Sequence, residues 1–139
     1  MVFIPRKQKY KKSQKRRSFL KVNSVYSLNS LKFGSFGLKT MEPGLLSSKQ
    51  IESMFQSINK IIKKSGRIVL RVFSHEPVSK KPIEVRMGKG KGNVSHWVAK
   101  LSAGTLLCEL ESNFPFLVFK ALRLAQIRLP LKTKIIIQK

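Results

Sequence analysis

The sequence predicts an α+β fold, in which two helices cover a mostly antiparallel sheet and an extended basic arm precedes the folded part. Helical and strand-like segments alternate irregularly, and two strands follow each other in hairpin order, which favours α+β over a doubly wound fold. Hydrophobic residues make up 42% of the 139 positions, enough for the core of one domain. Because basic residues crowd the N-terminus, we assign residues 1–31 to the arm and 32–139 to a single domain.

The domain is predicted to begin with a strand and a clearly marked helix. Residues 31–40 alternate in part, and the glycines among them suit a bulge or a close approach of another backbone. Ser47 precedes Gln50 by three residues, which is a capping box, and opens a helix with Gly66 as its C-cap. The apolar face of this helix consists of Ile51, Met54, Phe55, Ile58, Ile61 and Ile62.

The middle of the chain is predicted to contain a strand and a long loop. Residues 67–73 read as a buried strand with Arg71 on its polar side. Two prolines and then three alternate glycines follow. We therefore expect a short strand over 83–86 within a protruding loop that spans about residues 80–95.

The last third is predicted to form a hairpin, a helix and a strand. Residues 95–101 and 105–111 both have strand patterns and are joined by a short glycine-containing turn. Asn113 is the expected cap of a second helix, which has a proline in its first turn and ends near Arg128. Residues 132–139 complete the domain as a strand.

The charge balance predicts a polyanionic partner. The chain has 29 lysines and arginines against six acidic residues, a formal net charge of +23. A folded domain with so much like charge is stabilised beside a polyanion, most commonly nucleic acid. No acid precedes Glu42, and phosphates would relieve the repulsion among the eight basic residues in positions 6–17. The candidate contacts in the arm are Arg6, Lys7, Lys9, Tyr10, Lys11, Lys12, Lys15, Arg16 and Arg17.

Composition also disfavours several classes of function. The chain has no aspartate, which argues against carboxylate-dyad hydrolysis and Mg²⁺ sites. Cys108, His75 and His96 are too few ligands for structural zinc, so we expect no metal and no cofactor. The apolar runs are far shorter than the roughly 20 residues of a membrane span. A Cys108–His96 nucleophile pair is disfavoured, because a cysteine in an alternating strand is usually a small buried apolar residue.

Residues 86–93, RMGKGKGN, form the most distinctive local motif. Its glycines allow unusual backbone angles, and Lys89 and Lys91 can reach phosphates. The spacing fails the P-loop pattern, which requires Ser or Thr after its GK, and it fails the dinucleotide pattern G-x-G-x-x-G. On composition alone, a flexible hairpin tip and a phosphate contact are equally favoured.

Six segments match one known family in wording, order and spacing. They are FGSFGLK at 33–39, SSKQIE at 47–52, GRIVLRVF at 66–73, KPIEVRMGKGKGN at 81–93, HWVA at 96–99 and LPLKT at 129–133. On these motifs the chain resembles the bacterial-type large-subunit ribosomal protein L-sixteen family. The arm is less similar in letters, but it keeps a proline, a basic string and the aromatic Tyr10.

The resemblance implies a structural constituent of the large ribosomal subunit, folded as a hammerhead-like two-layer α/β sandwich. It also implies binding to large-subunit rRNA near the base of the central protuberance, with an extension toward A-site tRNA and the peptidyl transferase region. The arm would then be the chief rRNA anchor. Lys39, Arg67 and Arg71 would be further rRNA contacts, with solvated strand edges as an equally weighted alternative. The tRNA-facing loop would consist of Arg86, Met87, Gly88, Lys89, Gly90, Lys91, Gly92 and Asn93.

Two departures from the usual family pattern lead to further expectations. Phe114, Phe116 and Phe119 cannot all face one small core, so we expect a neighbouring ribosomal protein to cover the second helix, with drift of the core as the alternative. The Ile-, Lys-, Asn- and Ser-rich replacements around an intact loop favour an organellar genome. We expect the mitochondrial matrix as the location, with the bacterial cytoplasm or a plastid as alternatives.

The expected partners are therefore large-subunit rRNA, A-site tRNA and neighbouring large-subunit proteins. We expect no membrane partner, no homo-oligomer and no enzymatic activity. The alternative function is a small basic enzyme or a nucleotide-binding protein that uses the Gly88–Gly92 loop.

Overall fold

The computed structural model describes residues 4–14 and 30–138, and within these ranges the chain forms seven strands and two helices. All paired strands are antiparallel, in a four-stranded sheet of order β3-β6-β1-β7 and a three-stranded sheet of order β2-β5-β4. The elements are β1 (Phe36–Thr40), β2 (Gly44–Ser47), α1 (Ser48–Ile62), β3 (Gly66–Leu70), β4 (Glu76–Lys80), β5 (Asn93–Leu101), β6 (Leu106–Ser112), α2 (Pro115–Ile127) and β7 (Thr133–Ile137).

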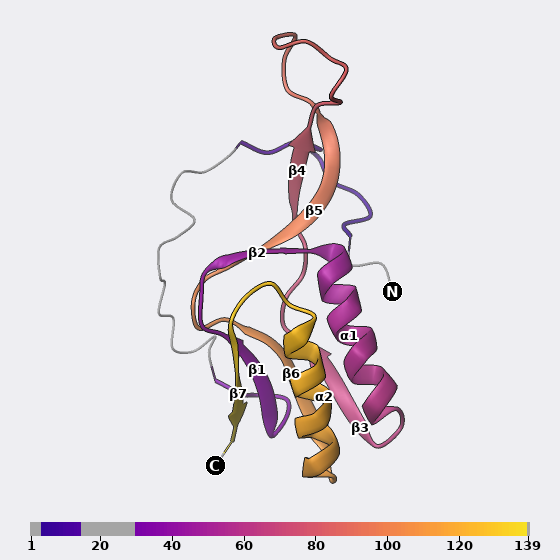
Figure 1. The fold of residues 1–139 in the computed structure, drawn as a ribbon, viewed down its shortest axis with the longest axis vertical. Helices are drawn as coiled ribbons and strands as arrows, with labels where there is room; N and C mark the ends of the chain where they lie inside the picture. The colour runs from indigo at the N-terminus through magenta and orange to yellow at the C-terminus, as the bar shows by residue number, and fades with distance from the viewer. Residues whose placement is uncertain (1–3, 15–29, 139) are drawn as a thin grey trace.

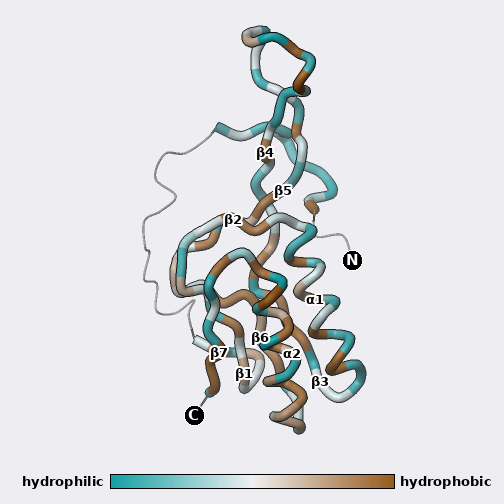
Figure 2. Tube along the Cα trace, in the orientation of Figure 1, coloured by the Kyte–Doolittle hydropathy of each residue, from teal (hydrophilic) through white to brown (hydrophobic). Residues whose placement is uncertain are grey.

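The molecule is elongated, with a packed body at one end and a projecting ribbon at the other (Figure 1). Helices α1 and α2 lie side by side; α2 contacts β1 and β6 of the four-stranded sheet, and α1 contacts β2 and β5 of the three-stranded sheet. Strands β4 and β5 extend away from this body to a loop over residues 81–92. Hydrophobic segments concentrate in the body, whereas the arm and the far end of the ribbon are mostly hydrophilic (Figure 2). The predicted α+β fold, with two helices on antiparallel strands, is confirmed.

Helix α1 begins at the predicted capping box. The Gln50 amide donates to Ser47 Oγ at 3.3 Å, and the Ser47 amide donates to Gln50 Oε1 at 2.9 Å, which satisfies two backbone donors at the helix start. The predicted C-cap at Gly66 is wrong. Lys63 takes the positive φ of 48° instead, and Gly66 already lies in β3. The residues of α1 that are buried in the core are Ile51, Met54, Ile58 and Ile62.

Helix α2 begins without the side-chain cap predicted at Asn113. Phe114 is the N-cap residue and makes no capping bond, although its amide donates to Ser112 Oγ at 3.2 Å. Pro115 takes the first helical position, where a missing N–H costs nothing. The helix packs against α1 through small and medium side chains, which permit a close approach of the two axes. Its buried residues are Val118, Ala121, Leu122 and Ala125.

The glycine that precedes β1 provides the close backbone approach that the sequence predicts. A Cβ on Gly34 would lie 2.5 Å from the carbonyl oxygen of Leu110, so a side chain there would force β1 and β6 apart. The pairing of these strands also shifts register between Leu38 and Lys39, as the predicted bulge requires.

The predicted hairpin of residues 95–101 and 105–111 is wrong, although both strands exist. Strand β5 belongs to the three-stranded sheet and β6 to the four-stranded sheet. The turn between them binds Thr40 at the end of β1: the Thr40 amide donates to Thr105 O at 2.9 Å, and the Gly104 amide donates to Thr40 O at 2.8 Å. At this contact the chain passes from one sheet to the other twice, once between β1 and β2 and once between β5 and β6.

The other errors concern the ribbon. Residues 83–86, predicted as a short strand, form a turn, and the partner of β5 is β4 over Glu76–Lys80. The proline at position 77 obscured this strand in the sequence. The proline is tolerated because β4 lies at the edge of its sheet. On the free side of an edge strand, the missing N–H of proline costs no hydrogen bond to another strand.

A buried carboxylate joins the start of the domain to its sheet. The side chain of Glu109 in β6 has no exposed surface, and its Oε2 accepts hydrogen bonds from the amides of Lys32 at 2.8 Å and Phe33 at 2.6 Å. Its Oε1 forms an ion pair with Arg71. Burial alone would raise the pKa of Glu109, but the two amides and the guanidinium together hold its pKa below the usual value.

Candidate RNA interface

The loop over residues 81–92 is the most prominent surface of the molecule, because it stands clear of the body (Figure 1). Gly88, Lys89 and Gly90 have positive φ values of 97°, 51° and 78°. A Cβ on either glycine would meet nothing within 4 Å, so the backbone conformation and not the available space favours glycine at both positions. The Lys81 ammonium donates to Gly88 O and ties the base of the loop to its tip.

Apolar and basic side chains are exposed together on this loop. The side chains of Ile83 and Met87 are 97% and 96% exposed. Large apolar side chains exposed to this extent indicate a surface that a partner covers. Arg86, Lys89 and Lys91 are also exposed. The only acid in residues 81–92 is the glutamate at position 84, so the loop combines positive charge with apolar contact area.

The N-terminal arm lies along the β4–β5 ribbon and reaches the loop. Gln8 Nε2 donates to His75 O at 3.3 Å near the start of the ribbon, and Lys12 Nζ donates to Lys91 O at 3.0 Å at its far end. The Lys91 ammonium in turn donates to Ser13 O. These reciprocal contacts join the predicted rRNA anchor to the predicted tRNA-facing loop in one continuous surface.

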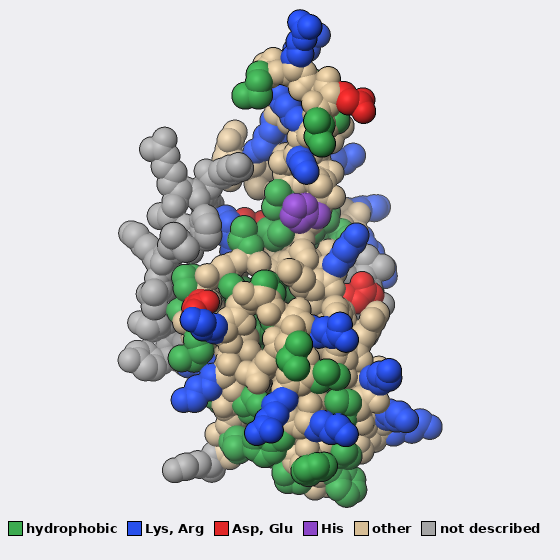
Figure 3. Space-filling model, viewed as in Figure 1, with side chains coloured by type: hydrophobic (Ala, Val, Ile, Leu, Met, Phe, Trp, Pro, Cys, Tyr) green, Lys and Arg blue, Asp and Glu red, His purple; other side chains and the backbone are tan. Residues whose placement is uncertain are grey.

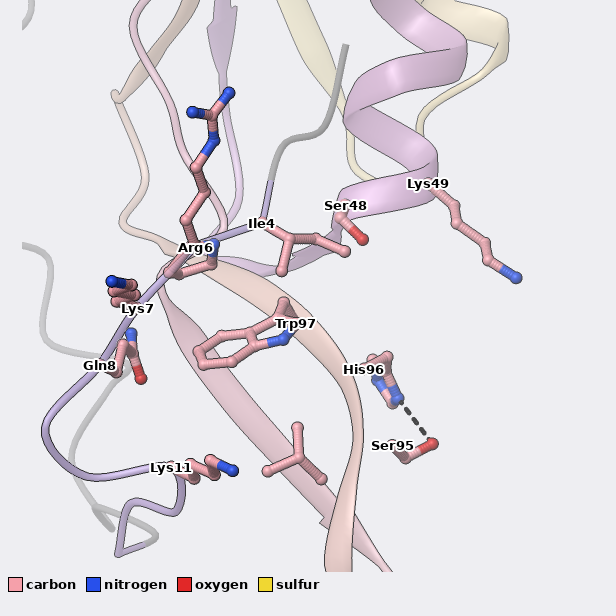
Figure 4. A pocket seen from close by; sticks show the side chains of 12 residues that line it. Ile4, Arg6, Lys7, Gln8, Lys11, Ser48, Lys49, Ser95, His96 and Trp97 are labelled. Atoms are coloured by element: carbon pink, nitrogen blue, oxygen red, sulfur yellow. Dashed lines mark hydrogen bonds between the residues drawn. The ribbon is translucent and has the colours of Figure 1, made fainter.

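A groove of about 700 Å³ separates the arm from β5 and the first residues of α1 (Figure 4). The Trp97 side chain projects from β5 toward the arm, and Lys49 stands at the start of α1 (Figure 4). Neither residue is among the site residues predicted from the sequence. The sequence feature that indicates Trp97 is that it is the single tryptophan of the chain and lies four residues after the glycine-lysine motif. The groove is lined by Ile4, Pro5, Arg6, Lys7, Gln8, Lys11, Ser48, Lys49, Val94, Ser95, His96 and Trp97.

Most of the predicted arm contacts lie on the surface of the arm. Tyr10 is 74% exposed, and the Lys9 ammonium lies 5.5 Å from the centre of its ring. The other exposed side chains in this set are Arg6, Lys7, Lys9, Lys11 and Lys12. The remaining three predicted contacts, Lys15, Arg16 and Arg17, lie outside the described residues.

The three predicted contacts in the domain have different surroundings. Arg67 is exposed on β3, and Lys39 is half-buried on β1 opposite Lys134 of β7. Arg71 is turned inward, because its guanidinium pairs with Glu109 and lies 5.4 Å from the centre of the Phe33 ring. Basic side chains are otherwise spread over the face shown in Figure 3, up to the tip of the loop.

The residues considered for nucleophilic chemistry are not brought together. Cys108 is fully buried in β6, whereas His96 is exposed on β5 in the other sheet. Burial raises the pKa of the Cys108 thiol to about 12, so the thiol is protonated at neutral pH. Within residues 4–14 and 30–138, no three His, Cys, Asp or Glu side chains are grouped closely enough to hold a metal ion. Neither helix in these ranges is long and apolar enough to cross a membrane.

Comparison with known proteins identifies the family of this chain. Residues 5–136 match the family described as Ribosomal protein L16p/L10e, which covers the described part of the arm, the ribbon, the loop and both helices. The chain belongs to the ribosomal protein L16p/L10e family. Among similar L16p/L10e sequences is the "Large ribosomal subunit protein uL16" of Dichelobacter nodosus (strain VCS1703A), which is 43% identical over 129 residues, 93% of this chain and 92% of the relative. The resemblance noted in the sequence is therefore confirmed, and L16p/L10e membership makes the chain a ribosomal protein.

Proposed function

We propose that the chain, as a structural constituent of the large ribosomal subunit, binds large-subunit rRNA through its basic arm and presents its glycine-lysine loop to A-site tRNA. The observation that carries this proposal is the continuous basic surface formed by the arm, the ribbon and the loop. Residues 4–14 and 81–92 together contain one acid, at position 84. The Lys12–Lys91 and Lys91–Ser13 contacts hold the two segments together.

The arm is proposed as the rRNA anchor because its cations are exposed and closely spaced. Structured RNA is recognised mainly through its backbone and shape, and single bases are taken by aromatic or guanidinium planes. The arm offers ammonium groups for phosphates and Tyr10 for stacking. Lys15, Arg16 and Arg17 belong to the same basic run in the sequence, and Lys39 and Arg67 extend the proposed contact over the domain. Arg71 serves this surface indirectly, since its guanidinium neutralises Glu109.

The loop is proposed to contact a moving RNA and not a fixed one. Lysine ammonium groups are point charges on flexible stems, which can follow a phosphate backbone as it shifts. Arg86 adds a planar fork for a phosphate or a base edge, and Met87 adds apolar contact at the tip. At Gly88 and Gly90 the backbone takes positive φ values, which glycine adopts without strain, and neither residue adds a side chain to the tip. The set from Arg86 to Asn93 therefore stays together as the proposed tRNA-facing surface.

We also propose that the chain is not an enzyme and does not bind a mononucleotide through the loop. The Cys108 thiol is buried and protonated, and it lies in a different sheet from His96. The backbone after Gly92 enters a strand and not a helix, so no helix N-terminus faces the loop, unlike in P-loop and dinucleotide sites.

A neighbouring ribosomal protein is the proposed cover for the start of α2. Phe119 packs inside against Phe36, with ring centres 5.6 Å apart and an edge-to-face angle of 77°. Phe114 and Phe116 are 56% and 79% exposed. Hydrophobic side chains gather at this end of the molecule (Figure 3). Two exposed aromatic rings at one helix end form an apolar patch of the kind that marks a contact with another protein.

The mitochondrial matrix remains the proposed location, on the basis of the replacements around the intact loop. Fractionation tests this point separately from function. We expect the chain to sediment with the large subunit of mitochondrial ribosomes. Its recovery only with ribosomes of another compartment would contradict the location and leave the ribosomal role in place.

Salt dependence tests the anchor directly. Replacing Arg6, Lys7, Lys9, Lys11 and Lys12 with glutamine should flatten the slope of log K against log salt for rRNA binding by about 3 to 5, if each residue neutralises one phosphate. The matched control removes five exposed charges on the helices and the turn after α1: Lys60, Lys63, Lys64, Lys120 and Arg123. An equal change of slope in both variants would contradict an anchor located in the arm.

A further inference from the structure

We propose that the groove between the arm and β5 is a subsite for one unpaired nucleotide of RNA, with the base against Trp97 and the phosphate against the cations of the groove walls. This inference rests on the proposed RNA-binding function and assigns part of it to a specific place and a specific RNA feature. The groove of about 700 Å³ is within the range of roughly 300–1,000 Å³ that is usual for small-ligand sites.

The position of Trp97 is the first reason. It is the only tryptophan of the chain, and it is half-buried on β5 opposite Pro77 of β4. It is not a member of the hydrophobic core that joins the helices to the sheets. Its side chain instead lines the groove, facing the arm from Ile4 to Gln8 (Figure 4). A large aromatic ring beside a cleft on an RNA-binding surface is a stacking platform for a base.

The charge of the walls is the second reason. Arg6, Lys7 and Lys11 come from the arm and Lys49 comes from the opposite wall, at the start of α1. No aspartate or glutamate lines the groove. The cations of the two walls give the groove a positive potential, which suits it to a phosphate. A phosphate bound by these cations and a base stacked on Trp97 would make use of both features of the groove.

The third reason concerns what can enter the groove. A paired base offers its face only to its neighbours in the stack, so a duplex can meet this surface only through its backbone. A bulged or looped-out nucleotide can place its base in the cleft, whose lining includes the polar side chains of Gln8 and Ser95 as well as Trp97. An acidic peptide would satisfy the cations but would make no specific use of the ring. The combination therefore favours an unpaired nucleotide.

The test uses the fluorescence of Trp97 in the full chain, because no other tryptophan contributes to the signal. Two RNA hairpins are compared, identical except that one has a single-nucleotide bulge. We expect the bulged hairpin to quench Trp97 and to bind about 5- to 150-fold more tightly, the ratio that stacking of one base supplies. Trp97→Leu should remove this preference, and Trp97→Phe should retain part of it.

Lys49→Gln and Lys60→Gln provide a matched pair on one helix. The first should weaken binding of the bulged hairpin more than that of the paired one, and the second, at the far end of α1, should affect both hairpins equally. Tight but equal binding of both hairpins without quenching would overturn the subsite and leave RNA binding intact. Absence of binding to either hairpin would overturn the proposed function itself. Quenching by poly-glutamate equal to that by bulged RNA would show that the partner class is wrong.

Discussion

Replacing Glu109 with glutamine should destabilise the domain more than any other change of a single acid. In the native protein, Oε2 accepts two backbone hydrogen bonds and Oε1 pairs with Arg71. Glutamine replaces one of these acceptor oxygens with a donor, so either the Lys32 and Phe33 amides or the guanidinium loses its partner. Breaking a buried ion pair by removing one member costs about 3–5 kcal/mol. For a chain of this size that corresponds to a fall of about 12–20 °C in Tm.

Thermal unfolding followed by circular dichroism measures this effect, with Glu111→Gln as the control. Glu111 is exposed on the same strand, two residues further along, and its replacement should change the stability by less than about 0.5 kcal/mol. Arg71→Met should cost a comparable amount to the Glu109 change, and the double variant should lose less than the sum of the two. If Glu109→Gln stays within about 1 kcal/mol of the control, the account of this contact is wrong.

The same contact predicts a dependence on pH. The folded-state pKa of Glu109 is lower than its unfolded value, so its stabilising contribution is fully present above the unfolded pKa. It should be lost as the pH falls through the folded pKa. The wild-type chain should therefore lose more stability in acid than Glu109→Gln does, and parallel pH profiles for the two proteins would refute the assignment.

Two further predictions concern the loop and the core. Lys89→Ala should weaken tRNA binding alone. Lys91→Ala should also weaken rRNA binding, because the Lys91 ammonium holds the arm at Ser13. Equal rRNA affinities of the two variants in a filter-binding assay would contradict this difference. Alkylation of Cys108 at pH 8 should be on the order of 1,000-fold slower in the native chain than in urea, because the thiol pKa is about 12 and the sulfur is buried. Similar alkylation rates in both states would show that the thiol is accessible in the native chain.

The features that could be predicted from the sequence are those determined by neighbouring residues. The capping box of Ser47 and Gln50 requires groups only three positions apart, and the periodicity of α1 is local as well. The loop from Arg86 to Asn93 was identified by its glycines, two of which, Gly88 and Gly90, take positive φ values that agree with that composition. The inward position of Phe119, in contrast, depends on Phe36, more than 80 residues earlier in the chain.

The errors arose where distant segments decide the structure. The strands β5 and β6 looked like a hairpin because the turn between them is short, but the turn binds Thr40, and this contact directs the two strands into different sheets. Strand β4 was hidden by its proline, which only an edge position permits. The groove beside Trp97 could not be predicted either, because it exists only when the arm lies against the ribbon.

A density map of the large ribosomal subunit with tRNA in the A site would test the central claim most directly. The account predicts that residues 4–14 lie against rRNA and that the tip at Lys89 ends beside the tRNA backbone. An arm that contacts only protein, or a tip enclosed by rRNA away from the tRNA path, would contradict it.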